Sequence, residues 1–176
     1  MFGPVILATV RLVELKHPRW PIALMLAVLS VGLTSLISPT RTLIGIKWAL
    51  LAVFFALTVS RLFSYLKNAR VVDDSHLYTA VSIYLLLGML WFALYDAIEV
   101  FNPGAIVNSS SVRTDPQTEL LYFSLVTLTT IGYGDVVAVH GEVRMLAALE
   151  GVTGVLYVAI TVALLVGSYK RRGDSG

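Results

Sequence analysis

The chain has 176 residues, of which 57% are hydrophobic and only 14% are charged, and its formal net charge is +2. Because soluble domains carry about 25% charged residues, this composition excludes a water-soluble globule and indicates a membrane protein in contact with lipid. The small net charge gives no reason to expect a nucleic-acid partner. The absence of cysteine excludes disulfides, cysteine-type zinc sites and thiol chemistry.

The N-terminal residues 1–19 are apolar but short for a membrane span, and they carry Arg11 and Glu14. They lack the small-residue cleavage site of a secretory signal. We interpret them as a cytoplasmic or interfacial segment, either an amphipathic helix at the membrane surface or an N-terminal extension of the first span.

Four later segments are long and apolar enough to cross a bilayer, since a hydrocarbon core of about 30 Å needs about 20 helical residues. The predicted fold is therefore an all-α membrane protein with four transmembrane helices. Residues 20–66 form a two-helix N-terminal region and residues 170–176 a cytoplasmic tail. The four spans are residues 20–37, 43–60, 77–95 and 143–167.

The first two spans give little indication of function. A voltage sensor needs arginine at every third position of a membrane helix, whereas the second span offers only Lys47 and Arg61. We therefore reject a voltage sensor and expect this pair of helices to brace the third span or to contact lipid.

Residues 118–135 form neither a span nor an ordinary loop. A helix over residues 118–129 covers about 18 Å at 1.5 Å per residue, which is about half a bilayer. Gly132 and Gly134 then interrupt the apolar sequence. Irregular backbone at membrane depth is tolerated only where it is buried in protein or lines a water-filled path. We therefore predict a re-entrant segment that enters and leaves on one side.

This segment resembles the pore helix and selectivity filter of tetrameric potassium channels. Residues 130–135 read Thr-Ile-Gly-Tyr-Gly-Asp, and residues 122–128 before them read Tyr-Phe-Ser-Leu-Val-Thr-Leu. The potassium-channel filter reads TVGYG, so this chain differs from it by one methylene group. The resemblance covers a pore domain over residues 77–169, with outer helix 77–95, pore helix 118–129, filter 130–135 and inner helix 143–167.

The chain departs from the family pattern beside the filter. Tyr122 and Phe123 stand where many members carry paired tryptophans, so the aromatic cuff is lighter. Val126 stands where some members place a glutamate that pairs with the aspartate after the filter. Inactivation behaviour that depends on this pair is therefore in doubt here.

The resemblance implies a homotetramer, because one chain holds one filter string and four copies must meet around an axis. It implies that K⁺ binds the carbonyls of residues 130–133, which replace the hydration shell of the ion. Asp135 would place negative charge at the outer mouth, and no cofactor besides permeant K⁺ is expected. The implied filter residues are Thr130, Ile131, Gly132, Tyr133 and Gly134.

Two stripes on the inner helix compete for the pore. The residues Val155, Val158, Val162 and Val166 recur at helical spacing, and so do Thr153, Tyr157 and Thr161. Water would favour the hydroxyls, whereas the family register implies the valines, which would form a hydrophobic cavity able to gate by dewetting; we favour the valines. Gly154 is interpreted either as a gating hinge or, with Gly151, as a site of close helix packing.

Glu150 is an ionisable residue inside an apolar helix, and such residues are functional candidates by default. We favour a supporting role behind the filter, bonded to pore-helix hydroxyls, over ligation of a permeating ion. Asp96 and Glu99, at the end of the third span, are interpreted as solvated, with a role at the outer mouth as the less favoured alternative.

Basic residues indicate the orientation of the chain. Nine of the 13 lysines and arginines flank the ends of the spans that share a side with both termini, and four acids accompany them. The opposite side holds four bases and seven acids. The positive-inside rule then predicts a multi-pass protein of the plasma membrane with both termini in the cytoplasm.

The predicted function is a potassium-selective channel that conducts K⁺ passively. One rival is a cation channel of the same architecture that also passes sodium. Another is a non-conducting membrane protein, such as a regulatory subunit or a lipid-binding scaffold. No nucleophile, base or metal cluster assembles from these residues, so we predict that the chain is not an enzyme.

Overall fold

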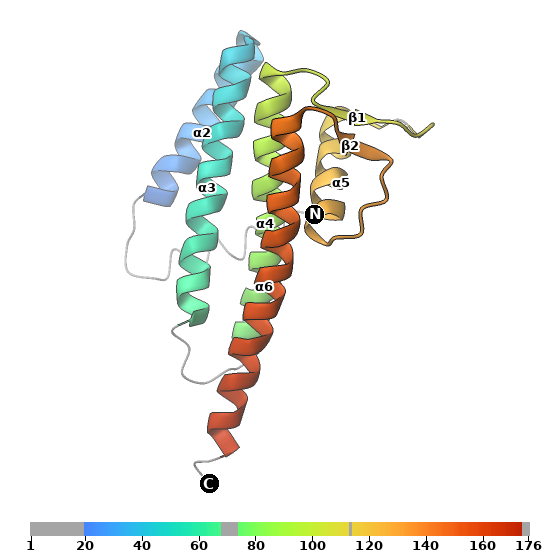
Figure 1. Cartoon of the computed structure of the whole chain (residues 1–176). Coiled ribbons are helices and arrows are strands. Elements are labelled where there is room, and N and C mark those ends of the chain that lie inside the picture. The colour runs from blue at the N-terminus through green and yellow to red at the C-terminus, as the bar shows by residue number, and fades with distance from the viewer. Residues whose placement is uncertain (1–19, 68–73, 113, 174–176) are drawn as a thin grey trace.

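The computed structural model describes residues 20–67, 74–112 and 114–173. The predicted interfacial segment 1–19 and residues 174–176 of the predicted tail lie outside them. The described elements are, in chain order, α2 (Trp20–Ile37), α3 (Arg41–Lys67), α4 (Asp74–Phe101), β1 (Ile106–Asn108), α5 (Pro116–Leu128), β2 (Val136–Ala138) and α6 (Gly141–Gly173) (Figure 1).

Within the described residues, three helical segments are long and apolar enough to cross a membrane, namely Arg41–Lys67, Ser75–Phe101 and Gly141–Val166. In α2 the stretch Leu24–Thr34 is apolar but shorter. The chain is thus a mostly helical, multi-pass membrane protein, as predicted. The first predicted span, residues 20–37, is not among these three and stays a prediction.

The long helices continue beyond the apolar segments from which they were expected. α4 runs through Asp96 and Glu99 to Phe101, and α6 runs to Gly173. Apolar sequence marks only the part of a helix that lies in lipid. The helix itself ends where the backbone finds other hydrogen-bond partners, so composition alone places its ends too early.

α3 and α4 pack against each other, and their buried residues include Ala52 and Phe55 of α3 and Ile83 and Leu87 of α4. Lipid is as apolar as leucine, so close packing rather than hydrophobic burial stabilises such pairs. In the view of Figure 1, α2 and α3 lie on one side of α4, and α5 and α6 lie on the other. The first two helices therefore flank the outer helix, away from α6.

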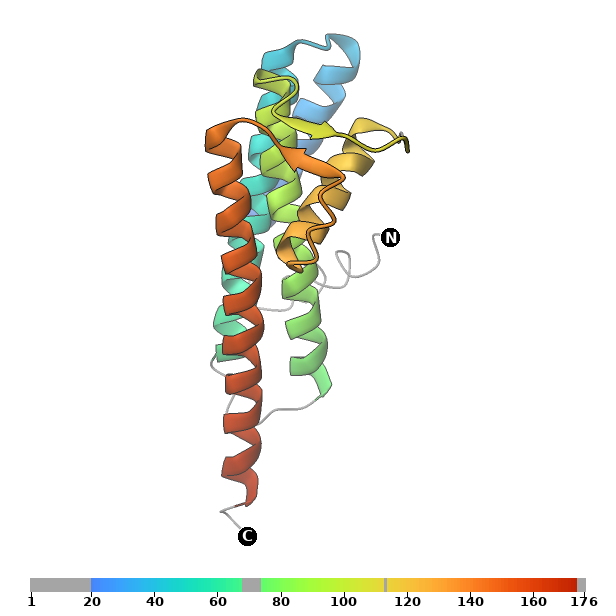
Figure 2. The same cartoon turned by 45° about the vertical axis from the view of Figure 1, so that its right-hand side comes forward.

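α5 packs against α4, α6 and β2. A second buried cluster holds it there, and Tyr95 of α4 lies edge-on to Phe123 of α5 with ring centroids 5.1 Å apart. In Figure 2, α5 stands beside the upper half of α4 and α6 rather than along their whole length. The other residues of this cluster are Phe92, Ala105, Leu120, Val136 and Val143.

The fold is mostly helical, as the all-α prediction expects, but it also contains a short sheet that the sequence did not indicate. β1 and β2 form a two-stranded antiparallel sheet with Ile106 opposite Ala138 and Asn108 opposite Val136. β-branched residues favour such strands. The paired segments are three residues long and far apart in the sequence, so no local pattern announces them.

Candidate ion-conduction site

α5 begins with a cap that positions the entrance to the site. The Asp115 carboxylate accepts hydrogen bonds from the Thr118 hydroxyl at 2.7 Å and from its backbone N–H at 3.0 Å. These bonds lower the pKa of Asp115, with the hydroxyl the larger cause. Pro116 occupies the start of the helix, where its missing N–H costs nothing. The Asp-Pro pair is a start signal that the sequence prediction of residue 118 overlooked.

The carboxyl end of α5 leads directly into the candidate filter. Thr129 is the C-cap, and its N–H bonds back to the Leu125 carbonyl at 3.1 Å. The Leu128 carbonyl accepts from the Tyr84 hydroxyl of α4 at 3.2 Å. The negative end of the α5 dipole therefore points toward residues 130–133, where it favours a cation.

The backbone of the filter segment alternates in handedness. φ is positive at Thr130 (58°), Gly132 (57°) and Gly134 (80°), and it is not positive at Ile131 or Tyr133. Such alternation turns successive peptide planes so that their carbonyls can face one side. Glycine adopts positive φ without penalty, whereas Thr130 is strained by roughly 1–2 kcal/mol. Strain of this kind collects at functional sites, and the sequence did not reveal it at Thr130.

The carbonyl oxygens of residues 130–133 accept no hydrogen bond from any described residue. The N–H groups of Ile131 and Gly132 do have a partner, because both point to the Val126 carbonyl at 3.0 and 3.3 Å. Residues 130–133 are exposed in this subunit, so their carbonyl oxygens are open to water or to a cation.

Asp135 follows the filter and is held from two sides. Its carboxylate accepts from the Tyr122 hydroxyl of α5 at 2.8 Å, and this bond raises the pKa of Tyr122. Its backbone carbonyl accepts from the N–H of Ser109 at 2.7 Å. Tyr133 stacks on Tyr122 with ring centroids 6.5 Å apart. The tyrosine that replaces a family tryptophan thus contacts both Tyr133 and Asp135.

The outer loop is tied to α4 and α5 by two carboxylates. Glu99 accepts from the N–H groups of Gly104 and Ile106, which fixes the turn before β1. Glu119 of α5 accepts from the Asn108 amide at 2.8 Å. The interpretation of both acids as simply solvated is wrong, because the Glu99 carboxylate caps this turn and Asp96 is buried.

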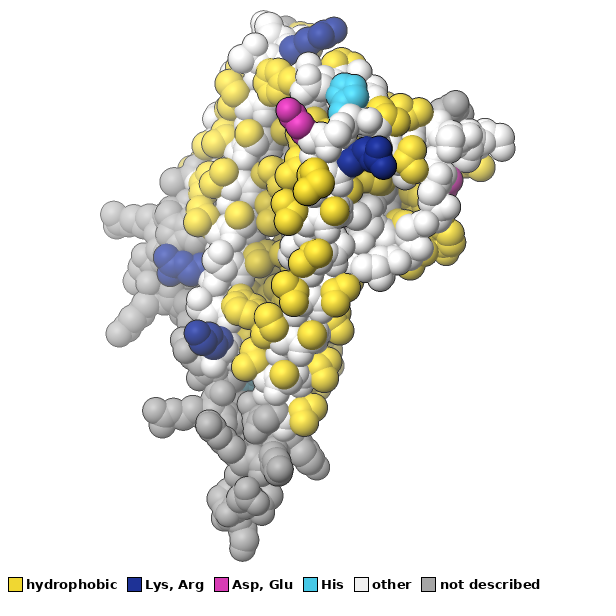
Figure 3. All heavy atoms as spheres, viewed as in Figure 1, with side chains coloured by type: hydrophobic (Ala, Val, Ile, Leu, Met, Phe, Trp, Pro, Cys, Tyr) yellow, Lys and Arg dark blue, Asp and Glu magenta, His cyan; other side chains and the backbone are white. Residues whose placement is uncertain are grey.

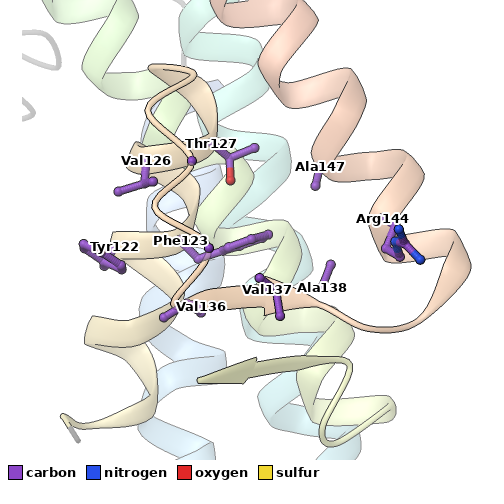
Figure 4. A pocket seen from close by; sticks show the side chains of 11 residues that line it. Tyr122, Phe123, Val126, Thr127, Val136, Val137, Ala138, Arg144 and Ala147 are labelled. Carbon is purple, nitrogen blue, oxygen red and sulfur yellow. The ribbon is translucent and has the colours of Figure 1, made fainter. Parts of the chain in front are cut away.

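A cavity of about 290 Å³ lies behind the filter. Figure 4 shows side chains of α5, β2 and α6 around it, with Arg144 and Ala147 reaching it from α6. Tyr122, Val126 and Thr127 line it from α5. Within the described part of this subunit, the filter segment therefore borders an open cavity on one side as well as the side chains of α5, β2 and α6.

The inner helix approaches the end of α5 most closely at Gly154. A methyl group added there would overlap the Leu128 carbonyl, whereas one added at Gly151 would lie 3.7 Å from the Thr127 carbonyl. The close approach of Gly154 to the Leu128 carbonyl thus supports the packing interpretation. The hinge alternative stays a prediction.

The two stripes of α6 face different surroundings. The Tyr157 hydroxyl donates to the Ala80 carbonyl of α4 at 2.7 Å, and Thr161 is buried on the same side. The valine stripe defined above is exposed, and Figure 3 shows apolar side chains along this face of α6. In this subunit the valines, not Tyr157 and Thr161, are free to line a shared path.

Glu150 is fully enclosed, with 0% of its surface exposed. Its carboxyl group contacts the hydroxyl of Ser124 of α5 at 2.6 Å and that of Tyr95 of α4 at 2.7 Å. It therefore lies behind the pore helix rather than beside residues 130–133. Ser124 and Tyr95 carried no signal in the sequence, because their roles depend on which helices meet.

Comparison with known proteins identifies the class of molecule. Residues 79–170, just over half of the chain, match the ion channel family, and the chain belongs to it. The relatives that it matches are potassium channels by name. These are not enzymes, which confirms that prediction.

Two relatives illustrate the similarity. The chain is 37% identical over 82 residues to two pore potassium channel a of Oryza sativa subsp. japonica, covering 46% of this chain and 20% of that protein. It is 30% identical over 97 residues to the potassium voltage-gated channel protein Shal of Drosophila melanogaster, covering 53% and 17%. The chain thus spans a fifth or less of these relatives. No solved structure matches it.

Proposed function

We propose that this chain is the subunit of a potassium-selective channel, which conducts K⁺ passively through a filter of residues 130–134. One observation carries the proposal. The carbonyls of residues 130–133 have no hydrogen-bond partner among the described residues, on backbone that alternates between positive and non-positive φ. Carbonyl rings that replace the hydration shell of K⁺ are the basis of potassium conduction.

The filter of one subunit supplies only one side of such a ring, which supports a homotetramer. Ile131 is 55% exposed and Tyr133 is 69% exposed, although both are large apolar side chains next to a membrane helix. The valine stripe of α6 is exposed on the same subunit. Closed cyclic assembly around an axis would complete the ring and cover these surfaces together.

In the proposed topology the protein lies in the plasma membrane and crosses it four times, with α2 as the first span. Both termini lie in the cytoplasm. The asymmetry of basic residues supports it through the positive-inside rule. In this topology α5 and the filter enter from outside, and Asp135 lies at the outer mouth. The domain boundaries predicted from the sequence are part of this proposal.

Ion flux through the purified protein in liposomes tests the function. We expect K⁺ flux that barium blocks and that sodium gradients do not drive. Equal flux of sodium and K⁺ would favour a non-selective cation channel of the same architecture. Absence of any cation flux, in protein shown to be folded, would favour a non-conducting membrane protein and overturn the proposal.

A further inference from the structure

Glu150 joins three helices through a short network of oxygen atoms. Its Oε2 lies 2.7 Å from the Tyr95 hydroxyl of α4, and its Oε1 lies 2.6 Å from the Ser124 hydroxyl of α5. The Ser124 hydroxyl also lies 2.8 Å from the Gly88 carbonyl of α4. All three distances are those of O–H···O hydrogen bonds, so each contact needs one proton between its oxygens.

Counting protons decides the state of the network. Three contacts require three protons, whereas the Tyr95 and Ser124 hydroxyls supply one each and the Gly88 carbonyl supplies none. If Glu150 were ionised, either the Ser124–Glu150 contact or the Ser124–Gly88 contact would bring together two oxygens with no proton between them. A protonated Glu150 supplies the third proton and satisfies every contact.

The surroundings of Glu150 agree with this count. α4, α5 and β2 pack against α6, and the Tyr95 phenol is the titratable group that contacts Glu150 from them. No lysine, arginine or histidine of the described residues forms an ion pair with it. An unpaired charge at such a buried place costs several kcal/mol, and a neutral carboxylic acid avoids that cost.

We propose that Glu150 is a neutral carboxylic acid that donates its proton to Ser124, and that this proton positions the pore helix. Ser124 is then free to donate to Gly88, so that one chain of bonds runs from α6 through α5 to α4. Loss of the proton to a base in solution would draw the Ser124 hydrogen toward Glu150. The hydrogen bond between α5 and α4 would then break, about one helical turn before the end of α5 at Leu128. The positioning role rests on the proposed function.

Infrared spectroscopy of the full-length protein in lipid vesicles tests the protonation without any measurement of conduction. We expect the C=O stretch of a protonated carboxylic acid at neutral pH, shifted by ¹³C-labelled glutamate and absent from Glu150→Gln. Glu142→Gln is the control, since Glu142 is exposed on the same helix, and it should leave the band in place. A wild-type spectrum without the band, or a band that survives in Glu150→Gln, overturns the proposal.

The pH dependence of K⁺ flux tests the positioning role. Glutamine donates from its amide nitrogen to Ser124 and accepts from Tyr95, but it has no proton to lose. We expect flux through the wild type and Glu142→Gln to fall as the pH becomes alkaline, and flux through Glu150→Gln to stay level over that range. Equal pH profiles for wild type and Glu150→Gln overturn the positioning role. Absence of flux in the wild type would sink the proposed function while the infrared band still decides the protonation.

Discussion

Gly132 lies where the chain needs a backbone conformation that other residues avoid. Its φ is +57°, and no atom outside its chain neighbours lies within 4 Å of an added Cβ, so any penalty for a side chain comes from the backbone. That penalty is roughly 1–2 kcal/mol in the left-handed region. This penalty disfavours the conducting conformation of the filter, and each 1.4 kcal/mol lowers the population of that conformation about tenfold.

We therefore expect Gly132→Ala to reduce K⁺ flux in liposomes by about tenfold or more. Gly104→Ala is the matched control, because Gly104 also has positive φ (+84°) and an empty surrounding but lies in the turn before β1. Both variants should lower thermal stability, and only Gly132→Ala should abolish most of the flux. Equal flux in the two variants would contradict a role of the filter backbone.

Residue identity led to the prediction of a filter over residues 130–135, but it did not reveal the contacts that hold this segment. The Thr-Ile-Gly-Tyr-Gly-Asp string is a local pattern, and so it could be found in the sequence alone. The strain at Thr130 and the Tyr122–Asp135 bond could not be predicted, because they depend on how α5 meets the returning chain. Glu150 was recognised as unusual from its type, whereas its partner Tyr95 comes from a helix 55 residues away.

At the scale of helices, the contact between α6 and α5 distinguishes two roles for Gly154. Replacing glycine with alanine inside a helix gains about 1 kcal/mol in propensity. At Gly154 the added methyl group would overlap the Leu128 carbonyl, and overpacking costs about 1–3 kcal/mol. At Gly151 the nearest atom lies at ordinary contact distance, 3.7 Å.

We therefore expect Gly154→Ala to lower the melting temperature and the K⁺ flux, and Gly151→Ala to leave both at or above wild-type values. Thermal unfolding in detergent and flux in liposomes measure the two effects. If Gly154→Ala kept its melting temperature and lost only flux, hinge motion rather than packing would explain the glycine.

The cap of α5 predicts a dependence of stability on pH. Because the Thr118 hydroxyl and N–H lower the pKa of Asp115 in the folded state, the cap stabilises the fold above the unfolded pKa of about 3.9. Its contribution is lost as the pH falls through the lower, folded value. Asp115→Ala should thus melt below wild type at neutral pH, and the difference should shrink below about pH 4. A difference that is the same at both pH values would contradict the cap.

The short helix α5 could be predicted from the sequence, whereas the β1–β2 sheet could not. A helix that covers about half the bilayer thickness and is followed by two glycines can adopt few other arrangements than a re-entrant one in a membrane. The sheet joins β1, in the loop after α4, to β2, the strand that follows Asp135. Next to it, the Ser109 N–H donates to the Asp135 carbonyl. Such pairings arise from tertiary proximity, and the three-residue strands carry too little pattern to reveal it.

At the scale of the whole molecule, the placement of α2 and α3 determines which face of the subunit is left open. In the view of Figure 1 they lie beside α4, on the side away from α6. The valine stripe and the filter residues Ile131 and Tyr133 are left exposed. A symmetry axis beside α6 would bring both the filters and the valine stripes of four subunits together.

Cysteine substitution on α6 tests where this axis lies, and the chain has no native cysteine to interfere. Val162 is exposed, whereas its neighbour Thr161 is buried on the side facing α4. We expect a charged, membrane-impermeant thiol reagent applied from the cytoplasmic side to block K⁺ flux through Val158→Cys and Val162→Cys. Thr161→Cys should be unmodified, because neither water nor the reagent reaches it. Block of Thr161→Cys with Val162→Cys unaffected would show that the hydroxyl stripe lines the pore, and α6 would then have to rotate on assembly.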